Sequence, residues 1–134
     1  MFVDAAAIIA ILSDEREAAR CAEAIGSATA RTTSAVAVWE AAIALASDRK
    51  LGIARTDAAE LVRRFLDQRG IDLVDLPPPV EAVTLAVGAA ERFGSGPRRL
   101  NLADCFHYAC AKHSGVPVLS TADEFRSTDL EVVP

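Results

Sequence analysis

The sequence predicts an α/β domain with a central, mainly parallel sheet of about four to five short strands. Short apolar segments alternate with helical ones along all 134 residues, and this alternation is typical of parallel sheets covered by helices on both faces. Apolar residues make up 51% of the chain and charged residues 25%, a composition that supports a buried core and argues against disorder. We therefore expect a single domain over residues 1–134, without a linker.

The first half of the chain is predicted to alternate strands with helices. Residues 1–4 form a short apolar run that ends in Asp4, which we interpret as a strand. Asp14 has the chemistry of an N-cap for a following helix, and Thr33 or Ser34 can cap the next one. The expected elements are strands at 1–4 and 28–32 and helices at 5–13, 18–25 and 35–49.

Turn residues delimit the elements of the second half. Gly70 closes an amphipathic helix, three prolines at 77–79 precede another, and Gly115 ends a helix that Asn101 can cap. Alternating apolar and acidic residues at 71–76 indicate a half-exposed strand. The expected elements are helices at 57–69, 80–93 and 102–113 and strands at 71–76, 116–120 and 130–133.

Net charge and cysteine content limit the possible partners and compartment. The net charge of −5 gives no long-range attraction to nucleic acid. Any contact with RNA or DNA must therefore be local, and Arg98 with Arg99 is the only basic pair in a suggestive place. The three cysteines form no CxxC pair, and we find no signal peptide or membrane span. We therefore expect a cytoplasmic protein with free thiols and no membrane partner.

Four carboxylates lie near predicted strand ends or helix starts. Asp4 ends the first strand, Glu40 lies inside an otherwise apolar helix, Asp104 begins a helix, and Asp123 follows a strand. In open α/β sheets, ligands bind beyond the carboxyl ends of the strands. Clustered acids repel one another unless a cation offsets the repulsion and the loss of solvation. An all-oxygen set suits Mg²⁺ or Mn²⁺ rather than zinc, and such an ion suits phosphodiester hydrolysis.

The same acids also have structural interpretations. Asp104 could interact favourably with its helix dipole, and Asp123 could occupy the turn for which Thr121 and Glu124 form a capping-box pattern. Glu40 is harder to explain in this way, because a buried carboxylate without a partner is unstable. The joint placement of all four acids favours a shared cation site.

Two other features have a structural alternative. His107 and Cys110 lie three residues apart on one predicted helix, with Cys105 and His113 nearby. Zinc is conceivable, but the spacing matches no familiar site, so a packed helix face is the favoured interpretation. Trp39 could stack on RNA bases, but its apolar helix favours a place in the core.

Several segments resemble the PIN-domain ribonucleases, most closely the VapC toxins of bacterial toxin–antitoxin pairs. The likeness covers nearly the whole chain and is carried by "FVDAAAIIAIL", "TTSAVAVWEAAIAL", "LNLADCFHYACAKHSGVPVLSTADEF" and "RSTDLEVV". The third segment is the most specific, because it is similar to the family's Asn–x–x–Asp helix followed by a short strand and an acidic turn. The resemblance implies a PIN-like α/β/α sandwich that binds Mg²⁺ or Mn²⁺ and cuts single-stranded regions of RNA.

The resemblance also implies roles for individual residues. The four acids correspond to those of the family, three of them as metal ligands. Because Glu124 directly follows Asp123, which of the two is the fourth acid stays open. Asn101 matches the asparagine before the third acid. Independently of the resemblance, Arg98 and Arg99 are candidates for holding the RNA backbone, with a solvated basic pair as the alternative interpretation. The implied set is Asp4, Glu40, Asp104 and Asp123 as catalytic acids, Asp4, Asp104 and Asp123 as metal ligands, and Asn101, Thr121 and Glu124 as auxiliary residues.

Ala5 and Ala6 depart from the family, which commonly has Thr or Ser just after the first acid. A hydroxyl at that place would orient a water or a neighbouring carboxylate, so ligand positioning is expected to be looser here. Thr33, Ser34 and Thr121 could compensate. A catalytically weak or inactive interaction module therefore stays as an alternative function, and an aspartyl-phosphate type hydrolase is a second one.

The resemblance finally implies partners. We expect a homodimer and a cognate VapB-like antitoxin that inserts a segment into the active-site groove, where an arginine could pair with the carboxylates. Because the chain is acidic, we expect contact with DNA only through the antitoxin.

Overall fold

The computed structural model describes residues 1–134 and contains one five-stranded sheet in the order β3–β2–β1–β4–β5. Every neighbouring pair of strands is parallel, which confirms the predicted fold class. The strands are short: β1 (Phe2–Val3), β2 (Thr32–Ser34), β3 (Asp72–Val74), β4 (Val118–Leu119) and β5 (Val132–Val133).

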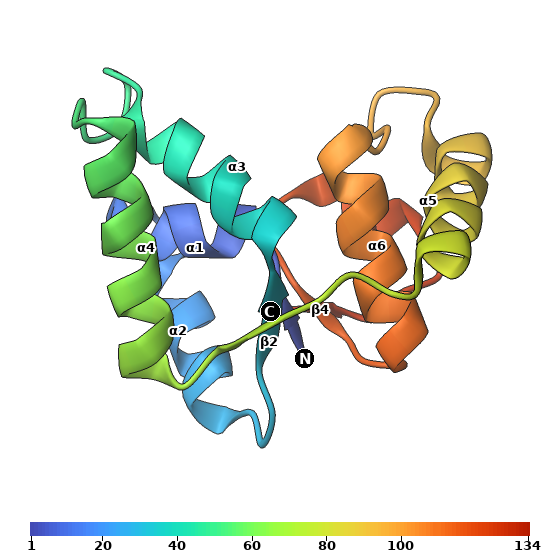
Figure 1. Ribbon diagram of the computed structural model, residues 1–134, viewed down its shortest axis with the longest axis horizontal. Helices are drawn as coiled ribbons and strands as arrows, with labels where there is room; N and C mark the ends of the chain where they lie inside the picture. Colours follow the sequence, from blue (N-terminus) through green and yellow to red (C-terminus); the bar gives the residue numbers. More distant parts are fainter.

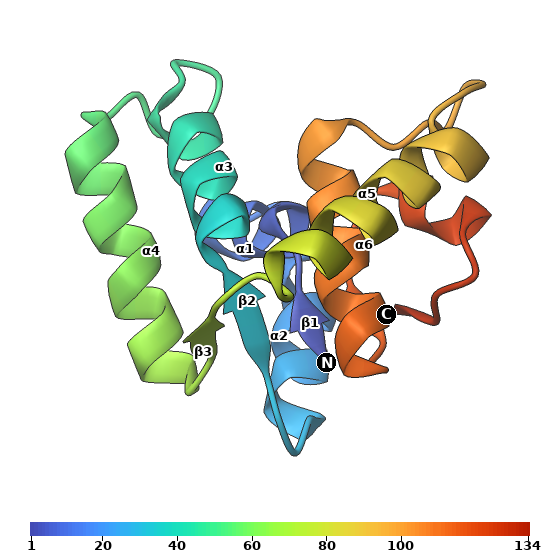
Figure 2. The same cartoon turned by 45° about the vertical axis from the view of Figure 1, so that its right-hand side comes forward.

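Helices connect the strands and cover the sheet. Figure 1 shows α3 and α4 on one side of the molecule and α5 and α6 on the other, with α1 and the central strands between them; Figure 2 shows β1, β2 and β3 side by side. No helix combines the length and the apolar character needed to cross a membrane. The helices are α1 (Ala5–Leu12), α2 (Ala18–Ser27), α3 (Ala35–Ala46), α4 (Arg55–Arg69), α5 (Pro79–Phe93), α6 (Leu102–Ser114) and the 3₁₀ helix η1 (Asp123–Ser127).

Most helix ends follow the turn chemistry of the sequence, with one exception. Ser34 caps α3 by accepting a hydrogen bond from the Ala37 amide at 3.3 Å. Gly70 and Gly115 end α4 and α6 in the left-handed region, where a side chain would be strained. The predicted Asp14 cap is wrong, because this residue has a φ of 53° and lies four residues before the start of α2.

Sheet register explains a second difference from the prediction. The second strand begins at Thr32 rather than at residue 28, because Thr32 pairs with Phe2 in the parallel ladder. The edge strand β3 is exposed along its whole length, more than a half-exposed strand would be.

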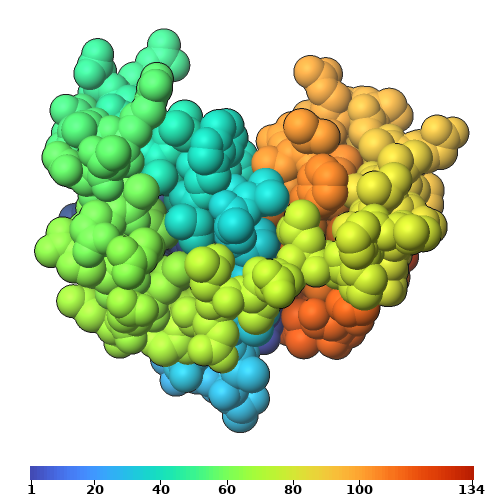
Figure 3. Space-filling view, in the orientation of Figure 1, coloured from blue at the N-terminus to red at the C-terminus, as the bar shows by residue number.

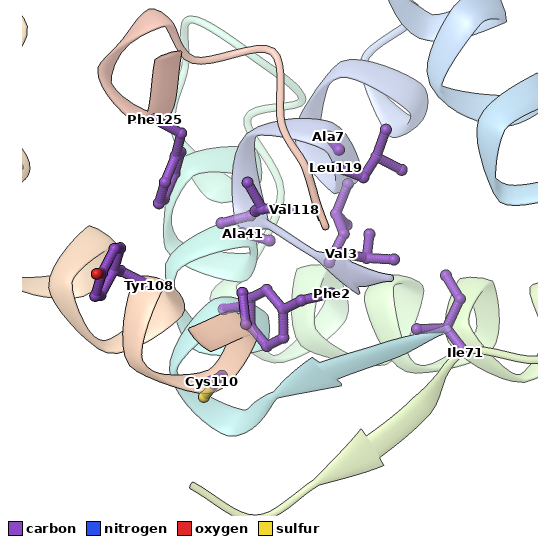
Figure 4. Close-up of a cluster of buried hydrophobic side chains, with 14 of the residues drawn as sticks. Phe2, Val3, Ala7, Ala41, Ile71, Tyr108, Cys110, Val118, Leu119 and Phe125 are labelled. Carbon is purple, nitrogen blue, oxygen red and sulfur yellow. The ribbon is translucent and has the colours of Figure 1, made fainter. Parts of the chain in front are cut away.

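The core lies around β1, whose two residues are both buried. Figure 4 shows Phe2 and Val3 next to Val118 and Leu119 of β4, with Ala41 of α3 nearby. On α3, one stripe made of three alanines and Leu45 is buried, whereas Trp39 is 64% exposed. The prediction that Trp39 belongs to the core is therefore wrong, and the apolar character of α3 on its outer side needs another explanation.

Candidate active site

The ends of β1 and β4 open into a small acidic cavity of about 150 Å³. It lies between the start of α1, the middle of α3, the start of α6 and the turn after β4. Figure 3 shows the molecular surface hollowed between α3 and α6. The lining residues are Asp4, Ala5, Ala6, Ile9, Glu40, Asn101, Asp104, Ala122 and Glu124.

Asp4 is the most buried of these acids, with 2% of its surface exposed. It caps α1, and its Oδ2 accepts hydrogen bonds from the Ala6 amide at 3.3 Å and from the Ser120 hydroxyl at 2.6 Å. Its Oδ1 lies 2.6 Å from Nδ1 of His107. Neighbouring polar groups therefore contact both oxygens of this carboxylate and fix its direction.

Asp104 is fixed by the capping box at the start of α6. Its Oδ2 accepts a hydrogen bond from the Asn101 amide at 2.7 Å, while its own amide donates to the Asn101 side chain at 3.0 Å. Burial raises the pKa of Asp104, the Asn101 hydrogen bond opposes this, and the negative charge of Asp4 adds to the rise. The Asn101 hydrogen bond thus fixes the direction of this carboxylate, while its raised pKa shows that its surroundings disfavour the negative charge.

Glu40 faces the same cavity from α3 and is half-buried. Its pKa is raised, mainly by burial, and the neighbouring charges of Asp4 and Asp104 raise it further, while His107 acts in the opposite direction. The structure therefore brings three of the four predicted acids to one cavity, and two of them have a raised pKa.

His107 is part of this cluster, which the sequence interpretation as a merely packed helix face did not anticipate. The ring is completely buried, with Nδ1 next to Asp4 and Nε2 3.8 Å from Oε2 of Glu40. Burial lowers the pKa of His107, but the contact with Asp4 and the surrounding negative charges outweigh this and raise it. One signal was available: residues three apart on a helix share a face, so His107 lies on the side of Asp104.

Ser120 is a residue of the cluster that the sequence analysis did not single out. It is completely buried, donates to Asp4 and accepts a hydrogen bond from the Ala122 amide at 3.0 Å. Val3 pairs with Leu119 in the sheet, so the residues that follow them are neighbours. A polar residue at the end of an apolar strand was the available signal.

The acidic turn after β4 differs in detail from the expectation. Asp123 is 64% exposed in its side chain and lies near Arg98 at 3.9 Å and Arg126 at 3.6 Å, and it does not line the cavity. Glu124 does line the cavity. The expected capping box of Thr121 does not form, because η1 begins without a side-chain cap.

Arg98 and Arg99 lie in the exposed loop between α5 and α6. Arg98 contacts Asp123 through an exposed ion pair, and the exposed side chain of Arg99 forms no hydrogen bond or ion pair. Both guanidinium groups are therefore accessible to a ligand. This placement suits the predicted contact with RNA.

The residues around the cavity fit a divalent cation. Asp4, Glu40 and His107 each offer a ligand atom within 4.8 Å of the others. Buried Asp4 Oδ1 and both ring nitrogens of His107 have no hydrogen-bond partner of good geometry, although Oδ1 and Nδ1 face each other. Burial and mutual repulsion disfavour the charged form of Glu40 and Asp104, and a bound cation would offset both effects.

The comparisons with known proteins agree with the fold. The model of the PIN domain matches residues 1–129. The chain belongs to the PIN-domain family. It is 34% identical to a ribonuclease VapC of Mycolicibacterium smegmatis, over 99% of both chains. It is also 36% identical to ribonuclease VapC28 of Mycobacterium tuberculosis, over 98% of this chain and 96% of the other. These relatives place it among the VapC proteins.

Two solved structures share the fold of this PIN-domain protein. The crystal structure of Mycobacterium tuberculosis VapC20, a toxin that cleaves the sarcin–ricin loop, has a TM-score of 0.73 at 18% identity and covers 99% of this chain and 98% of that one. A toxin–antitoxin complex from Klebsiella pneumoniae has a TM-score of 0.69 at 14% identity, over 99% and 95% of the two chains.

Proposed function

We propose that this protein is a divalent-metal-dependent endoribonuclease that cuts single-stranded regions of RNA as the toxin of a toxin–antitoxin pair. The observation that carries the proposal is the gathering of Asp4, Glu40 and Asp104 in one cavity from three distant parts of the chain. The VapC relatives named as ribonucleases, similar over nearly the whole chain, support the same activity.

The cluster suggests how the residues divide the work. Asp4 and Asp104 would hold Mg²⁺ or Mn²⁺, since hydrogen bonds fix the direction of both carboxylates. The bound ion would supply positive charge to stabilise the charge that develops at the scissile phosphate. Glu40, with its raised pKa and partial exposure, is suited to accept a proton from the attacking water.

Glu124 takes the place of the fourth acid in this proposal. Glu124 lines the cavity, and its charge contributes to the raised pKa of Asp104, whereas Asp123 points to Arg98 and Arg126. Residues 123 and 124 form a matched pair for testing this, because they are adjacent acids with different surroundings.

The test is cleavage of a single-stranded RNA in Mg²⁺ or Mn²⁺. We expect the Asp4→Asn and Glu124→Gln variants to lose activity and the Asp123→Asn variant to keep most of it. Equal cleavage by wild type and the Asp4→Asn variant would reject the site. Cleavage that persists in EDTA would reject the metal.

The alternative functions receive less support. An aspartyl-phosphate hydrolase needs a lysine at the phosphate, but Lys50 pairs with Glu15 and Lys112 with Asp129, and neither lines the cavity. An inactive interaction module would not need several acids close together at the strand ends, where burial and mutual repulsion destabilise their charged forms. The absence of hydroxyls at Ala5 and Ala6 is offset by the Ser120 hydroxyl, which already contacts Asp4.

We further propose that a cognate antitoxin neutralises this protein by placing an arginine in the acidic cavity, where its guanidinium pairs with Asp4 and Asp104. Contact with DNA would then come through the antitoxin, since this chain has a net charge of −5. A small upstream reading frame encoding a DNA-binding protein would supply the partner. Its purified product should stop RNA cleavage, and replacing its arginine should abolish that effect.

A homodimer accounts for the exposed apolar side chains of α5. Val80, Val83 and Val87 form one helical stripe and are 82%, 58% and 62% exposed. The stripe borders an apolar groove of about 300 Å³ between α5 and α6, which reaches the active-site residue Asn101. A second copy packed on this stripe would remove the apolar surface from water. Light scattering should give a dimer for the wild type and a monomer for Val83→Glu, with Arg63→Glu on α4 as the matched control.

A further inference from the structure

The two residues after Asp4 are alanines and offer it no hydroxyl. The Ser120 hydroxyl donates to Oδ2 of Asp4, and the other oxygen, Oδ1, lies beside the imidazole of His107. We propose that His107 is a positioning residue that holds Asp4 in the direction required for cation binding. The proposal rests on the metal-dependent activity proposed above and assigns a role to a residue outside the acidic set.

The contact geometry assigns one neighbour to each oxygen of Asp4. Oδ2 is held by the Ser120 hydroxyl at 2.6 Å and by the Ala6 amide at 3.3 Å. Oδ1 has no hydrogen-bond partner of good geometry but lies 2.6 Å from Nδ1 of His107, which is itself without another partner. Two buried polar atoms without other partners therefore face each other at close range, and each is the only polar neighbour available to the other.

The imidazole acts from beneath the cavity rather than from its wall. His107 is completely buried and is not among the residues that line the cavity, whereas Asp4 and Glu40 are. The ring packs beside Phe2 with the ring centroids 5.8 Å apart, which fixes its orientation. Its second nitrogen lies 3.8 Å from Oε2 of Glu40, so that one ring stands between two acids from different elements.

Residues of this kind matter for metal binding. Carboxylates that bind metal ions are themselves held by hydrogen bonds, and losing such a support typically weakens metal affinity or activity about 10–100-fold. Because α6 carries both Asp104 and His107, the same helix would supply one ligand and orient another. Cation binding by the cluster then depends on α6 in two separate ways.

The experiment compares the His107→Asn and His107→Gln variants, whose side chains end in the same amide group but differ in length by one methylene. The Asn amide lies near the position of Nδ1 and can donate to Asp4, whereas the longer Gln side chain reaches toward Glu40 instead. We expect the Kd for Mn²⁺, measured by calorimetry, to stay close to that of the wild type in the Asn variant. We expect it to rise about 10–100-fold in the Gln variant and in His107→Phe. His113→Asn, at the exposed histidine of the same helix, is the control.

A cleavage assay provides a second measurement. In the Gln and Phe variants, the Mn²⁺ concentration that gives half-maximal cleavage should rise, while the maximal rate changes much less. Thermal unfolding without metal identifies any variant that is not folded, and if Phe fails this check, the Asn–Gln comparison decides. Equal Kd values for the Asn and Gln variants would overturn the proposal. So would a directly bound imidazole nitrogen in the pulsed EPR spectrum of the Mn²⁺ complex. Failure of the wild type to bind Mn²⁺ would instead refute the underlying function.

Discussion

Two acids lie at different heights along helix α6, and their surroundings differ. Beside the later turns, Asp129 accepts hydrogen bonds from Tyr108 at 2.8 Å and from Arg92 and Lys112, both at 3.1 Å. In the first turn, Asp104 meets the cavity that also contains Asp4. Asp129 has two cations beside it, whereas Asp104 has the Asn101 amide and further acids.

The pKa values follow this difference. The Tyr108 hydrogen bond, followed by the contacts with Lys112 and Arg92, lowers the pKa of Asp129 to about 2, against the opposing effect of burial. Burial and neighbouring acids raise the pKa of Asp104. A carboxylate with chain-supplied cations stabilises the fold. A cluster of several carboxylates around one buried histidine, in which burial and mutual repulsion raise the pKa of Asp104 and Glu40, is suited to bind a cation from solution.

The largest expected effect is the loss of RNA cleavage in the Asp104→Asn variant. We expect a decrease of about 1,000-fold, or about 4 kcal/mol of transition-state stabilisation, because the cation would lose a ligand. The free energy of unfolding without metal should stay the same or rise, since the Asn side chain keeps an acceptor for the Asn101 amide and removes a repelling charge. Cleavage rates and chemical denaturation measure the two effects. A folded variant with full activity would contradict the comparison.

Divalent cations should stabilise the wild type substantially. Ligand that binds only the folded state at 100 times its Kd adds about 2.7 kcal/mol to the free energy of unfolding. We expect this gain with Mn²⁺ in the wild type and its loss in Asp4→Asn, with the Asp129→Asn variant as a matched control that keeps it. Denaturation with and without Mn²⁺ gives the values, and an equal gain in Asp4→Asn would place the cation elsewhere.

The Asp129→Asn variant should show the opposite behaviour to Asp104→Asn. We expect a destabilisation of about 1 kcal/mol, a modest value because the carboxylate is partly exposed and solvent screens its ion pairs. RNA cleavage should be unchanged. Since the folded pKa lies below the usual 3.8, the stabilisation is present above that pH and is lost as the pH falls toward 2. Unfolding at pH 7 and pH 2.5 tests this, and no difference between the variant and wild type at pH 7 would refute it.

The smallest expected effect concerns the pH dependence at Glu40. Its folded pKa is raised, so the folded protein without metal binds a proton at a pH where the unfolded chain does not. Stability from this residue therefore increases as the pH falls toward the ordinary glutamate pKa of 4.5, and the gain is complete below that pH. The Glu40→Gln variant should lack this component when its denaturation curves are compared with those of the wild type. Identical pH dependence of the two proteins would show that Glu40 is not in an acidic environment.

The sequence was sufficient for the fold and for part of the cluster. Parallel strands place their carboxyl ends on one edge, so Asp4 could be assigned to the candidate site from strand order alone, and Asn101 with Asp104 from the capping pattern. His107 could not be assigned in this way, because a histidine on a packed helix face has the same local pattern as one beneath a cavity. Only the packing of α6 against β1 decides between them.

Two other differences have a similar origin. Asp123 and Glu124 are adjacent in a 3₁₀ turn, and successive residues of such a turn point in different directions. Which acid faces the cavity depends on where the turn begins, and the sequence pattern does not determine this. Trp39 is apolar but exposed. The sequence did not predict this, because apolar composition alone does not distinguish a helix face buried within the chain from an apolar face on the surface.

The central claim is that the acids at the ends of β1 and the start of α6 bind one cation together. An anomalous difference map from crystals grown in Mn²⁺ tests this most directly. The account predicts a peak in the cavity, within coordination distance of both Asp4 and Asp104. Manganese bound only at other places, in crystals of a protein that cleaves RNA in the same buffer, would contradict it.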